Sequence, residues 1–158
     1  MLSVMEVILA LKSTPLFCEV PGEGLKRLSD FIQEKTIRSG EMVFAEQDLG
    51  DEMYLVRSGQ ISVLQDVSGE QTRVDVVTTG GHFGEMAIID DRPRSATAVA
   101  DQDSSLLVLH KNDFRSAVQD YPDIAFEVFR ELTRRLRRSD QRYRELMGQA
   151  RRLGLEVS

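Results

Sequence analysis

The sequence contains few of the residues on which several protein classes depend. Cysteine occurs once, at Cys18, so no intrachain disulfide can form and we expect a reducing, cytoplasmic location. The most apolar run near the start, Val7 to Leu11, is far below the roughly 20 residues of a membrane span, and no basic segment precedes it as in a signal peptide. The two histidines, His82 and His110, lie far apart, and no group of His, Cys, Asp or Glu has metal-ligand spacing. We therefore expect no secreted disulfide scaffold, no membrane protein, no metal site and no enzyme.

The composition is that of one globular domain spanning residues 1–158. Apolar residues make up 41 % and charged residues 29 % of the chain. The net charge of −6 is unevenly divided, because nine arginines and six acids follow residue 120 and leave an acidic body before them. The basic residues of this tail alternate with acids, which indicates a solvated helix face and no direct DNA binding.

Three stretches differ in their hydrophobic period. Residues 1–35 have helical spacing, interrupted at Pro15 and at Pro21. Residues 36–110 alternate apolar and polar positions, with glycines at intervals of about ten residues, which is typical of short strands in a sandwich or barrel. Residues 111–158 return to helical spacing. The pattern predicts a mainly β fold with flanking helices, and a long helix at the C-terminal end.

The last helix carries apolar residues at heptad spacing. This seam needs a partner surface, which is either the protein's own β domain or a second copy of the chain, and we favour a homodimer. Ser139 falls on the same seam and places a hydroxyl where a coiled coil prefers leucine. The residues that would form the dimer contact are Phe129, Leu132, Leu136, Tyr143, Leu146 and Leu153.

The segment from Gly81 to Ala100 contains the residues that indicate a ligand-binding site. Glycines lead into a short helical run that starts at Glu85, and the N–H groups at the start of such a run favour an anion. Arg94 follows a turn at Pro93, and its planar guanidinium suits a phosphate. The carboxylate of Glu85 would repel an anion, so its place beside an anion site makes sense if the ligand also has hydroxyl groups that can donate to it. The alternatives are that Arg94 only pairs with Asp90 or Asp91 on the surface, and that Glu85 only complements the helix dipole.

This segment resembles the phosphate-binding cassette of the cyclic nucleotide-binding domain family. The matching residues are Phe83-Gly84-Glu85, then Met86 to Ile89, then Arg94-Ser95-Ala96. The segments 39–44 and 50–59 also resemble the family's first strands. The resemblance implies an eight-stranded antiparallel jelly roll flanked by helices, with the cassette at residues 83–96.

The resemblance also implies a role for each cassette residue. Glu85 would accept a hydrogen bond from the ribose 2′-hydroxyl, and Arg94 would pair with the cyclic phosphate. The N–H groups of Gly84, Met86 and Ala87 would line the anion pocket. Ser95 would add its N–H and hydroxyl, and the small Ala96 would let its strand approach the ligand.

For the purine, the resemblance points to the last helix. In the catabolite activator protein group this helix contributes hydroxyl residues, and Ser139 and Asp140 fall at those positions, Asp140 as a departure from a serine. A carboxylate suits the amino group of adenine and equally the N–H groups of guanine, and we favour cAMP over cGMP. The function implied is a non-catalytic sensor that signals through its C-terminal helix to an effector protein or a further domain. The alternative is the sensor half of a DNA-binding regulator that lacks its helix-turn-helix region.

Overall fold

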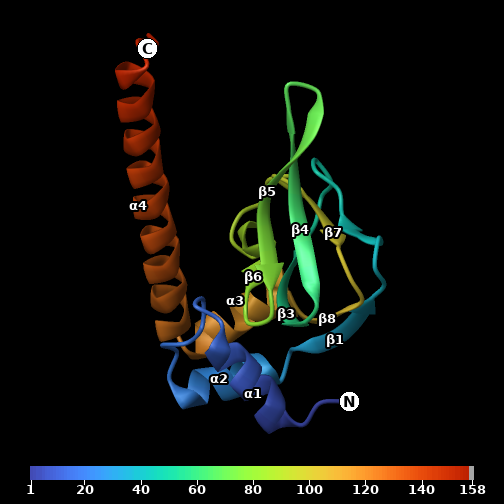
Figure 1. Cartoon of the computed structure of the whole chain (residues 1–158). Helices are drawn as coiled ribbons and strands as arrows, with labels where there is room; N and C mark the ends of the chain where they lie inside the picture. The colour runs from blue at the N-terminus through green and yellow to red at the C-terminus, as the bar shows by residue number, and fades with distance from the viewer. Residues whose placement is uncertain (157–158) are drawn as a thin grey trace.

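The computed structural model describes residues 1–156, so the last two residues of the helical segment predicted for 111–158 lie outside the description. The helices α1 (Val4–Ser13) and α2 (Gly22–Ser29) come first, and α3 (Lys111–Asp120) and α4 (Asp123–Arg152) come last (Figure 1). One 3-10 turn, η1 (Glu85–Ile88), interrupts the strands. The strands are β1 (Gln33–Ile37), β2 (Met42–Phe44), β3 (Glu52–Ser58), β4 (Gln60–Val67), β5 (Glu70–Thr78), β6 (His82–Phe83), β7 (Thr97–Ala100) and β8 (Ser104–His110).

The strands of residues 1–156 form two four-stranded sheets, with orders β1-β8-β3-β6 and β2-β7-β4-β5. Every pair is antiparallel, and β3 and β8 pair along nearly their whole length. The predicted eight-stranded antiparallel roll is therefore confirmed. It begins slightly earlier than the sequence pattern suggested, because α2 ends at Ser29 and β1 already starts at Gln33, where it pairs with Val108 of β8.

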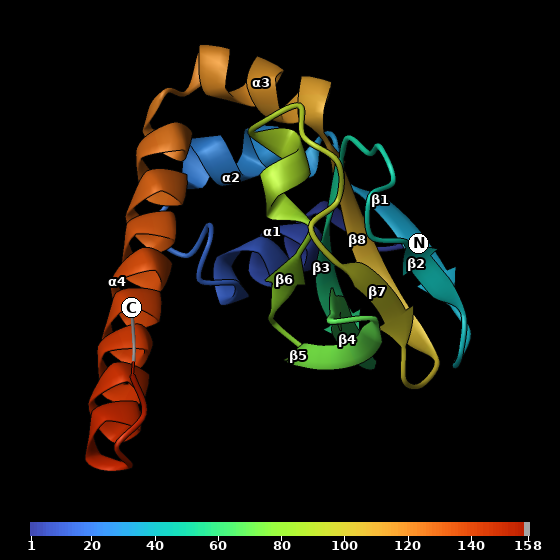
Figure 2. The same cartoon turned by 90° about the horizontal axis from the view of Figure 1, so that it is seen from above.

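The core has two parts, which lie on opposite faces of β3 and β8, so these two strands are buried on both sides. One cluster fills the roll and includes Tyr54, Ile61, Ala98 and Leu106. The other joins the helices to the outer face of β3 and β8, where Leu11 and Leu25 are among the fully buried residues. Figure 2 shows α1, α2 and α3 gathered at one end of the roll. This helical layer holds the start of α4 in place.

Helix α4 leaves the roll after its first turns. Ile124 and Val128 are buried, and Leu132 packs at the edge of the helical core. Beyond them α4 projects away from the roll (Figures 1 and 2). The apolar residues of the predicted seam are exposed there, with Leu136 at 63 % and Leu146 at 64 %. The seam after Leu132 therefore does not pack on the roll of the same chain.

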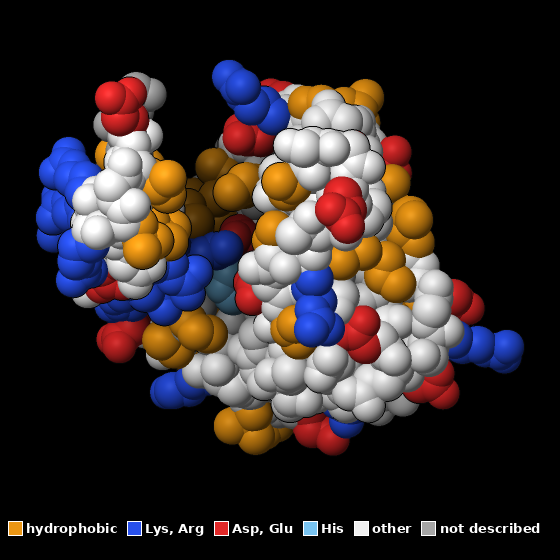
Figure 3. Space-filling model, turned by 45° about the horizontal axis from the view of Figure 1, so that its top comes forward, with side chains coloured by type: hydrophobic (Ala, Val, Ile, Leu, Met, Phe, Trp, Pro, Cys, Tyr) orange, Lys and Arg blue, Asp and Glu red, His pale blue; other side chains and the backbone are white. Residues whose placement is uncertain are grey.

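A hollow separates α4 from the roll. Figure 3 shows apolar side chains on the side of the helix that faces this hollow, and Lys and Arg side chains on its other side. Among residues 1–156, no helix has both the length and the apolar character that a membrane span requires.

Candidate functional site

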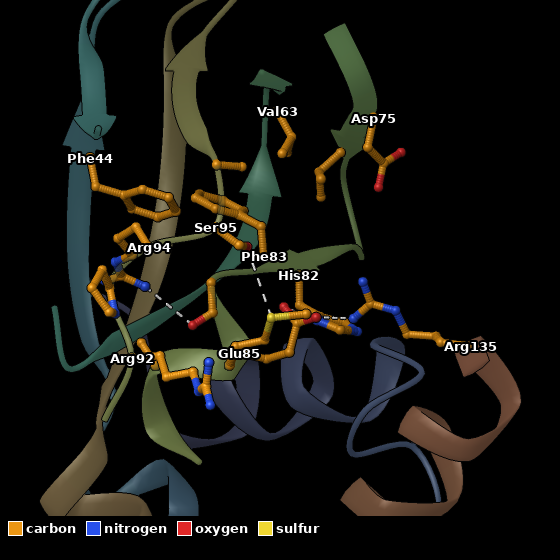
Figure 4. A pocket seen from close by; sticks show the side chains of 16 residues that line it. Phe44, Val63, Asp75, His82, Phe83, Glu85, Arg92, Arg94, Ser95 and Arg135 are labelled. Atoms are coloured by element: carbon orange, nitrogen blue, oxygen red, sulfur yellow. Dashed lines mark hydrogen bonds and ion pairs between the residues drawn. The ribbon is translucent and has the colours of Figure 1, made fainter. Parts of the chain in front are cut away.

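One pocket brings the predicted cassette together. Its wall includes all seven cassette residues expected to contact a ligand: Gly84, Glu85, Met86, Ala87, Arg94, Ser95 and Ala96. The opposite walls come from Phe44 of β2, Val63 of β4, and Asp75 and Val77 of β5, and Arg135 reaches in from α4 (Figure 4). The pocket thus lies between the cassette, the roll and the last helix.

The second residue of the cassette must be glycine. Gly84 has φ of +75°, and a Cβ at this position would lie 2.9 Å from Nη1 of Arg94 and 3.3 Å from the carbonyl oxygen of Glu52. The turn η1 follows, and the N–H of Ala87 donates to the carbonyl of Gly84 at 3.2 Å. The first N–H groups of a helical turn have no partner within it. The N–H of Ala87, predicted to line the anion pocket, is thus used inside the turn, whereas the N–H groups of Glu85 and Met86 have no partner within it.

The guanidinium of Arg94 is buried beside this turn. Arg94 is 6 % exposed, and its Nη1 donates to the carbonyl oxygen of Gly84 at 3.3 Å. Its Cζ lies 4.1 Å from the centre of the Phe44 ring, a cation–π contact. Its Nε is buried with no hydrogen-bond partner. Burial lowers the pKa of Arg94, but a guanidinium keeps its charge in proteins, so a buried cation with free donor capacity faces the pocket.

The expected alternative for Arg94, a surface ion pair with Asp90 or Asp91, is not formed within residues 1–156. Lys111 contacts both residues instead. Its Nζ donates to the carbonyl oxygen of Asp90 at 2.6 Å and to the carboxylate of Asp91. The Lys111 ammonium holds the pKa of the Asp91 carboxyl below its usual range. This contact ties the end of η1 to the first residue of α3.

Glu85 is a buried carboxylate whose counter-ion comes from α4. Its side chain is 5 % exposed, and Arg135 donates a hydrogen bond to its Oε1. Nδ1 of His82 lies 3.5 Å from its Oε2. A carboxylate that only complements a helix dipole would be expected at the surface. Glu85 instead lies inside the pocket wall, paired with a residue that is fifty positions away in the sequence.

The remaining cassette residues have modest contacts. The hydroxyl of Ser95 lies 3.9 Å from Sδ of Met86, and the carbonyl of Ser95 accepts a hydrogen bond from Gln65 at 3.0 Å. Ala96 is buried directly before the first residue of β7. Ser95 and Met86 are exposed at the pocket, so their side chains are accessible to a ligand.

The two residues expected at the purine lie elsewhere in this single chain. Ser139 and Asp140 are exposed on α4 and do not line the pocket. Asp140 faces a shallow hollow formed by α4 alone, together with Leu136 and Arg144. Residues four apart share a helix face, so Ser139 follows Arg135 about 6 Å further from the pocket. The role of both residues at the base stays a prediction.

Sequence reasoning missed several pocket residues. No motif or spacing in the sequence singles out Arg135, although it lies one turn before Ser139 on the same face of α4. Phe44 and Asp75 give no signal beyond their places in the stretch predicted to form strands. His82 directly precedes the cassette, and the sequence gives it no role in binding a ligand. These four side chains reach the pocket through packing that no local spacing encodes.

Comparison with known proteins agrees with this geometry. The sequence model of the family described as "Cyclic nucleotide-binding domain" matches residues 34–121. The chain belongs to the cyclic nucleotide-binding domain family. It is 32 % identical over 131 residues to the "Cyclic AMP receptor protein" of Thermus thermophilus, which covers 82 % of this chain and 61 % of that protein. It is also 35 % identical over 74 residues to a "cAMP-dependent protein kinase regulatory subunit" of Mucor circinelloides, covering 47 % of this chain and 17 % of that protein.

Solved structures of cyclic nucleotide-binding domains have the same fold. The crystal structure of the Thermus thermophilus catabolite activator protein aligns with a TM-score of 0.77 and 31 % identity, covering 85 % of this chain and 63 % of that one. The regulatory domain of Toxoplasma gondii PKA, crystallised with cAMP, aligns with a TM-score of 0.69 and 29 % identity, covering 74 % of this chain and 45 % of that one. The chain spans less than two thirds of the length of the curated relatives named above.

Proposed function

We propose that this cyclic nucleotide-binding domain is a non-catalytic, cytoplasmic cAMP sensor. The main support for the proposal is that a buried arginine and a buried carboxylate line the same pocket. Arg94, with an unpaired Nε, suits the cyclic phosphate, and Glu85 suits the ribose 2′-hydroxyl. A ligand that carries both an anionic phosphate and a hydroxyl matches these two groups. The backbone N–H groups at the start of η1 complete the anion site.

The choice of cAMP over cGMP rests on the relatives. The Thermus thermophilus and Mucor circinelloides proteins carry cyclic AMP in their names, and the Toxoplasma gondii domain was crystallised with cAMP. The purine would lie beyond the ribose, toward Val63, Asp75 and Arg135. Ser139 and Asp140 would contact it only if α4 moves, or from a second copy of the chain.

Signalling would run through α4. Arg135 joins this helix to Glu85, the group that would bind the ribose. A ribose hydroxyl and Arg135 would compete for the same carboxylate, so nucleotide binding would change the position of the helix. A ligand shifts such an equilibrium by its difference in affinity for the two positions.

The exposed seam of α4 supports a homodimer. Phe129, Leu136, Tyr143, Leu146 and Leu153 are each more than half exposed. They repeat at heptad spacing over most of the helix, which suits a second α4. Movement of α4 on nucleotide binding would then change the dimer and its contacts with an effector protein or a further domain.

The second candidate function is the sensor half of a DNA-binding transcription regulator. Two matches that favour it are the Thermus thermophilus receptor protein and a "CRP-like cAMP-activated global transcriptional regulator" of Mycobacterium tuberculosis, 28 % identical over 133 residues and covering 59 % of that protein. In this case, the output of α4 would be the orientation of a DNA-binding segment attached to it.

The test is calorimetric titration with cAMP, cGMP and 5′-AMP. We expect cAMP to bind most tightly, and we expect 5′-AMP, with its dianionic open phosphate, to bind weakly. Arg94→Ala should lose about 2–5 kcal/mol, which is at least a thirtyfold fall in affinity. Arg38→Ala, which changes an exposed arginine outside the pocket, should bind as the wild type does. Absence of binding of either cyclic nucleotide at millimolar concentration would overturn the proposal.

A further inference from the structure

A group of charged and titratable side chains, all buried except the partly exposed Arg135, lies where α4 meets the cassette. It consists of His82 on β6, Glu85 on η1, and Glu131 and Arg135 on α4. The side chain of His82 is 7 % exposed, and its Nδ1 has no hydrogen-bond partner. Figure 4 shows His82, Glu85 and Arg135 converging at the side of the pocket toward α4. The binding function proposed above does not use His82.

The two carboxylates of the group differ in how they are neutralised. Glu131 is paired within its own helix, with Arg134 at 3.4 Å and Arg138 at 3.3 Å, so its counter-ions move with it. Glu85 depends on the other side of the contact. Within residues 1–156, the cationic or titratable partners within salt-bridge distance of Glu85 are Arg135 and His82.

Movement of α4 away from the cassette would change which charges surround Glu85. Arg135 leaves with the helix, whereas Glu85 and His82 stay on the roll. A buried carboxylate that loses its only charged partner is strongly destabilised. Protonation of His82 at Nδ1 would restore a cation 3.5 Å from Glu85 without any movement of the chain. We propose that His82 and Arg135 are alternative counter-ions of Glu85, so that a proton taken from solvent by His82 releases α4 from the cassette.

The charges around His82 set the direction of this exchange. Burial, and next the positive charge of Arg135, lower the pKa of His82 to about 4, whereas Glu131 and Asp75 act in the opposite direction. Departure of α4 removes both Arg135, which lowers this pKa, and Glu131, which raises it by the smaller amount, and it leaves Glu85 unpaired beside the ring. The pKa of His82 must then rise toward its ordinary value of about 6.5. By linkage, a proton binds the released state more tightly, so acidification favours release.

The size of the effect follows from these two values. Between pH 7.5 and pH 5.5, a histidine with a pKa of about 4 stays neutral, whereas one near 6.5 becomes mostly protonated. The ratio of released to docked α4 should therefore increase over this range, by roughly tenfold at most, the limit reached if the pKa of His82 returns fully to its ordinary value. The exchange requires no nucleotide, so it can hold or fail independently of the ligand proposed above.

The first experiment measures the proton affinity of His82 by NMR. The chain has two histidines, so His110→Gln assigns both ring signals. In Arg135→Gln we expect His82 to bind a proton at least tenfold more tightly than in the wild type. Arg137→Gln, which changes an exposed arginine two positions along α4, should leave His82 unchanged. The double variant Arg135→Gln, Glu85→Gln should lose the gain, because no carboxylate remains for the imidazolium to balance.

The second experiment follows the helix itself. Spin labels at Gln71→Cys and Gln149→Cys, in a Cys18→Ser background, report the distance between β5 and the end of α4. The population with α4 displaced should grow on acidification from pH 7.5 to 5.5, and His82→Gln should abolish this growth. The proposal is overturned if the proton affinity of His82 is the same in wild type and Arg135→Gln, or if the distances do not depend on pH while both proteins remain folded.

Discussion

Gly50 lies directly against the guanidinium of Arg94, so that a Cβ at position 50 would be 2.6 Å from Nε. The same guanidinium stacks on Phe44 and donates to Gly84. Arg94 is therefore held on three sides, by a glycine, an aromatic ring and a carbonyl. The position of the phosphate site depends on all three.

Gly50→Ala should weaken nucleotide binding without changing any charge. The added methyl group overlaps the guanidinium, and displacing it costs about 1–3 kcal/mol. We expect a fall in cAMP affinity of roughly 5- to 150-fold by calorimetry. Gly22→Ala is the matched control, because a Cβ there meets nothing within 4 Å. Equal affinities in the two variants would show that the position of Arg94 does not limit binding.

Glu85→Gln should remove the discrimination between ribose and deoxyribose. A hydrogen bond from the 2′-hydroxyl to a charged acceptor contributes about 1.5–3 kcal/mol. The wild type should therefore bind cAMP roughly 10- to 150-fold more tightly than 2′-deoxy-cAMP. In Glu85→Gln this ratio should shrink to a few-fold, since an amide is a weaker acceptor. A ratio that stays large in the variant would place the ribose contact on another residue.

Lys111→Met should lower the free energy of unfolding. Lys111 is buried, and its Nζ joins α3 to the carbonyl of Asp90 at the end of η1. Loss of a charged hydrogen bond in this setting should lower the stability by about 1.5–3 kcal/mol, measured by urea denaturation. Lys26→Met removes only an exposed pair with Asp30, and it should lower the stability by less than about 1 kcal/mol. Similar losses in both variants would mean that the buried contact contributes no more than a surface pair.

Leu136→Glu with Leu146→Glu should prevent self-association. Both leucines are more than 60 % exposed on the α4 seam, where a second helix would bury them and a carboxylate would be left without water. Sedimentation should show a dimer for the wild type and a monomer for the variant. The control is Gln141→Glu, Gln149→Glu, which adds the same charge at exposed polar positions of α4. A monomeric wild type at micromolar concentration would contradict the dimer.

The fold class and the cassette could both be predicted from the order of the residues. Alternating strands and recurrent turn glycines predict an antiparallel roll because side chains of a strand alternate between core and solvent. The cassette could be found because Gly84, Glu85 and Arg94 lie within eleven positions of one another. Local turn geometry brings such close neighbours together whatever the rest of the chain does. The heptad pattern of α4 was likewise local, and it identified the face that the roll leaves exposed.

The distant residues that complete the site could not be predicted, because the packing of separate elements brings them together. Arg135 and Glu85 are fifty residues apart, and they meet because Ile124 and Val128 fix the start of α4 on the helical core. The contact of Gly50 with Arg94, the burial of His82 and the distance of Ser139 from the pocket follow in the same way. Each depends on how separate elements pack around a shared core. Packing is a property of the whole chain, and the spacing of residues within one segment does not encode it.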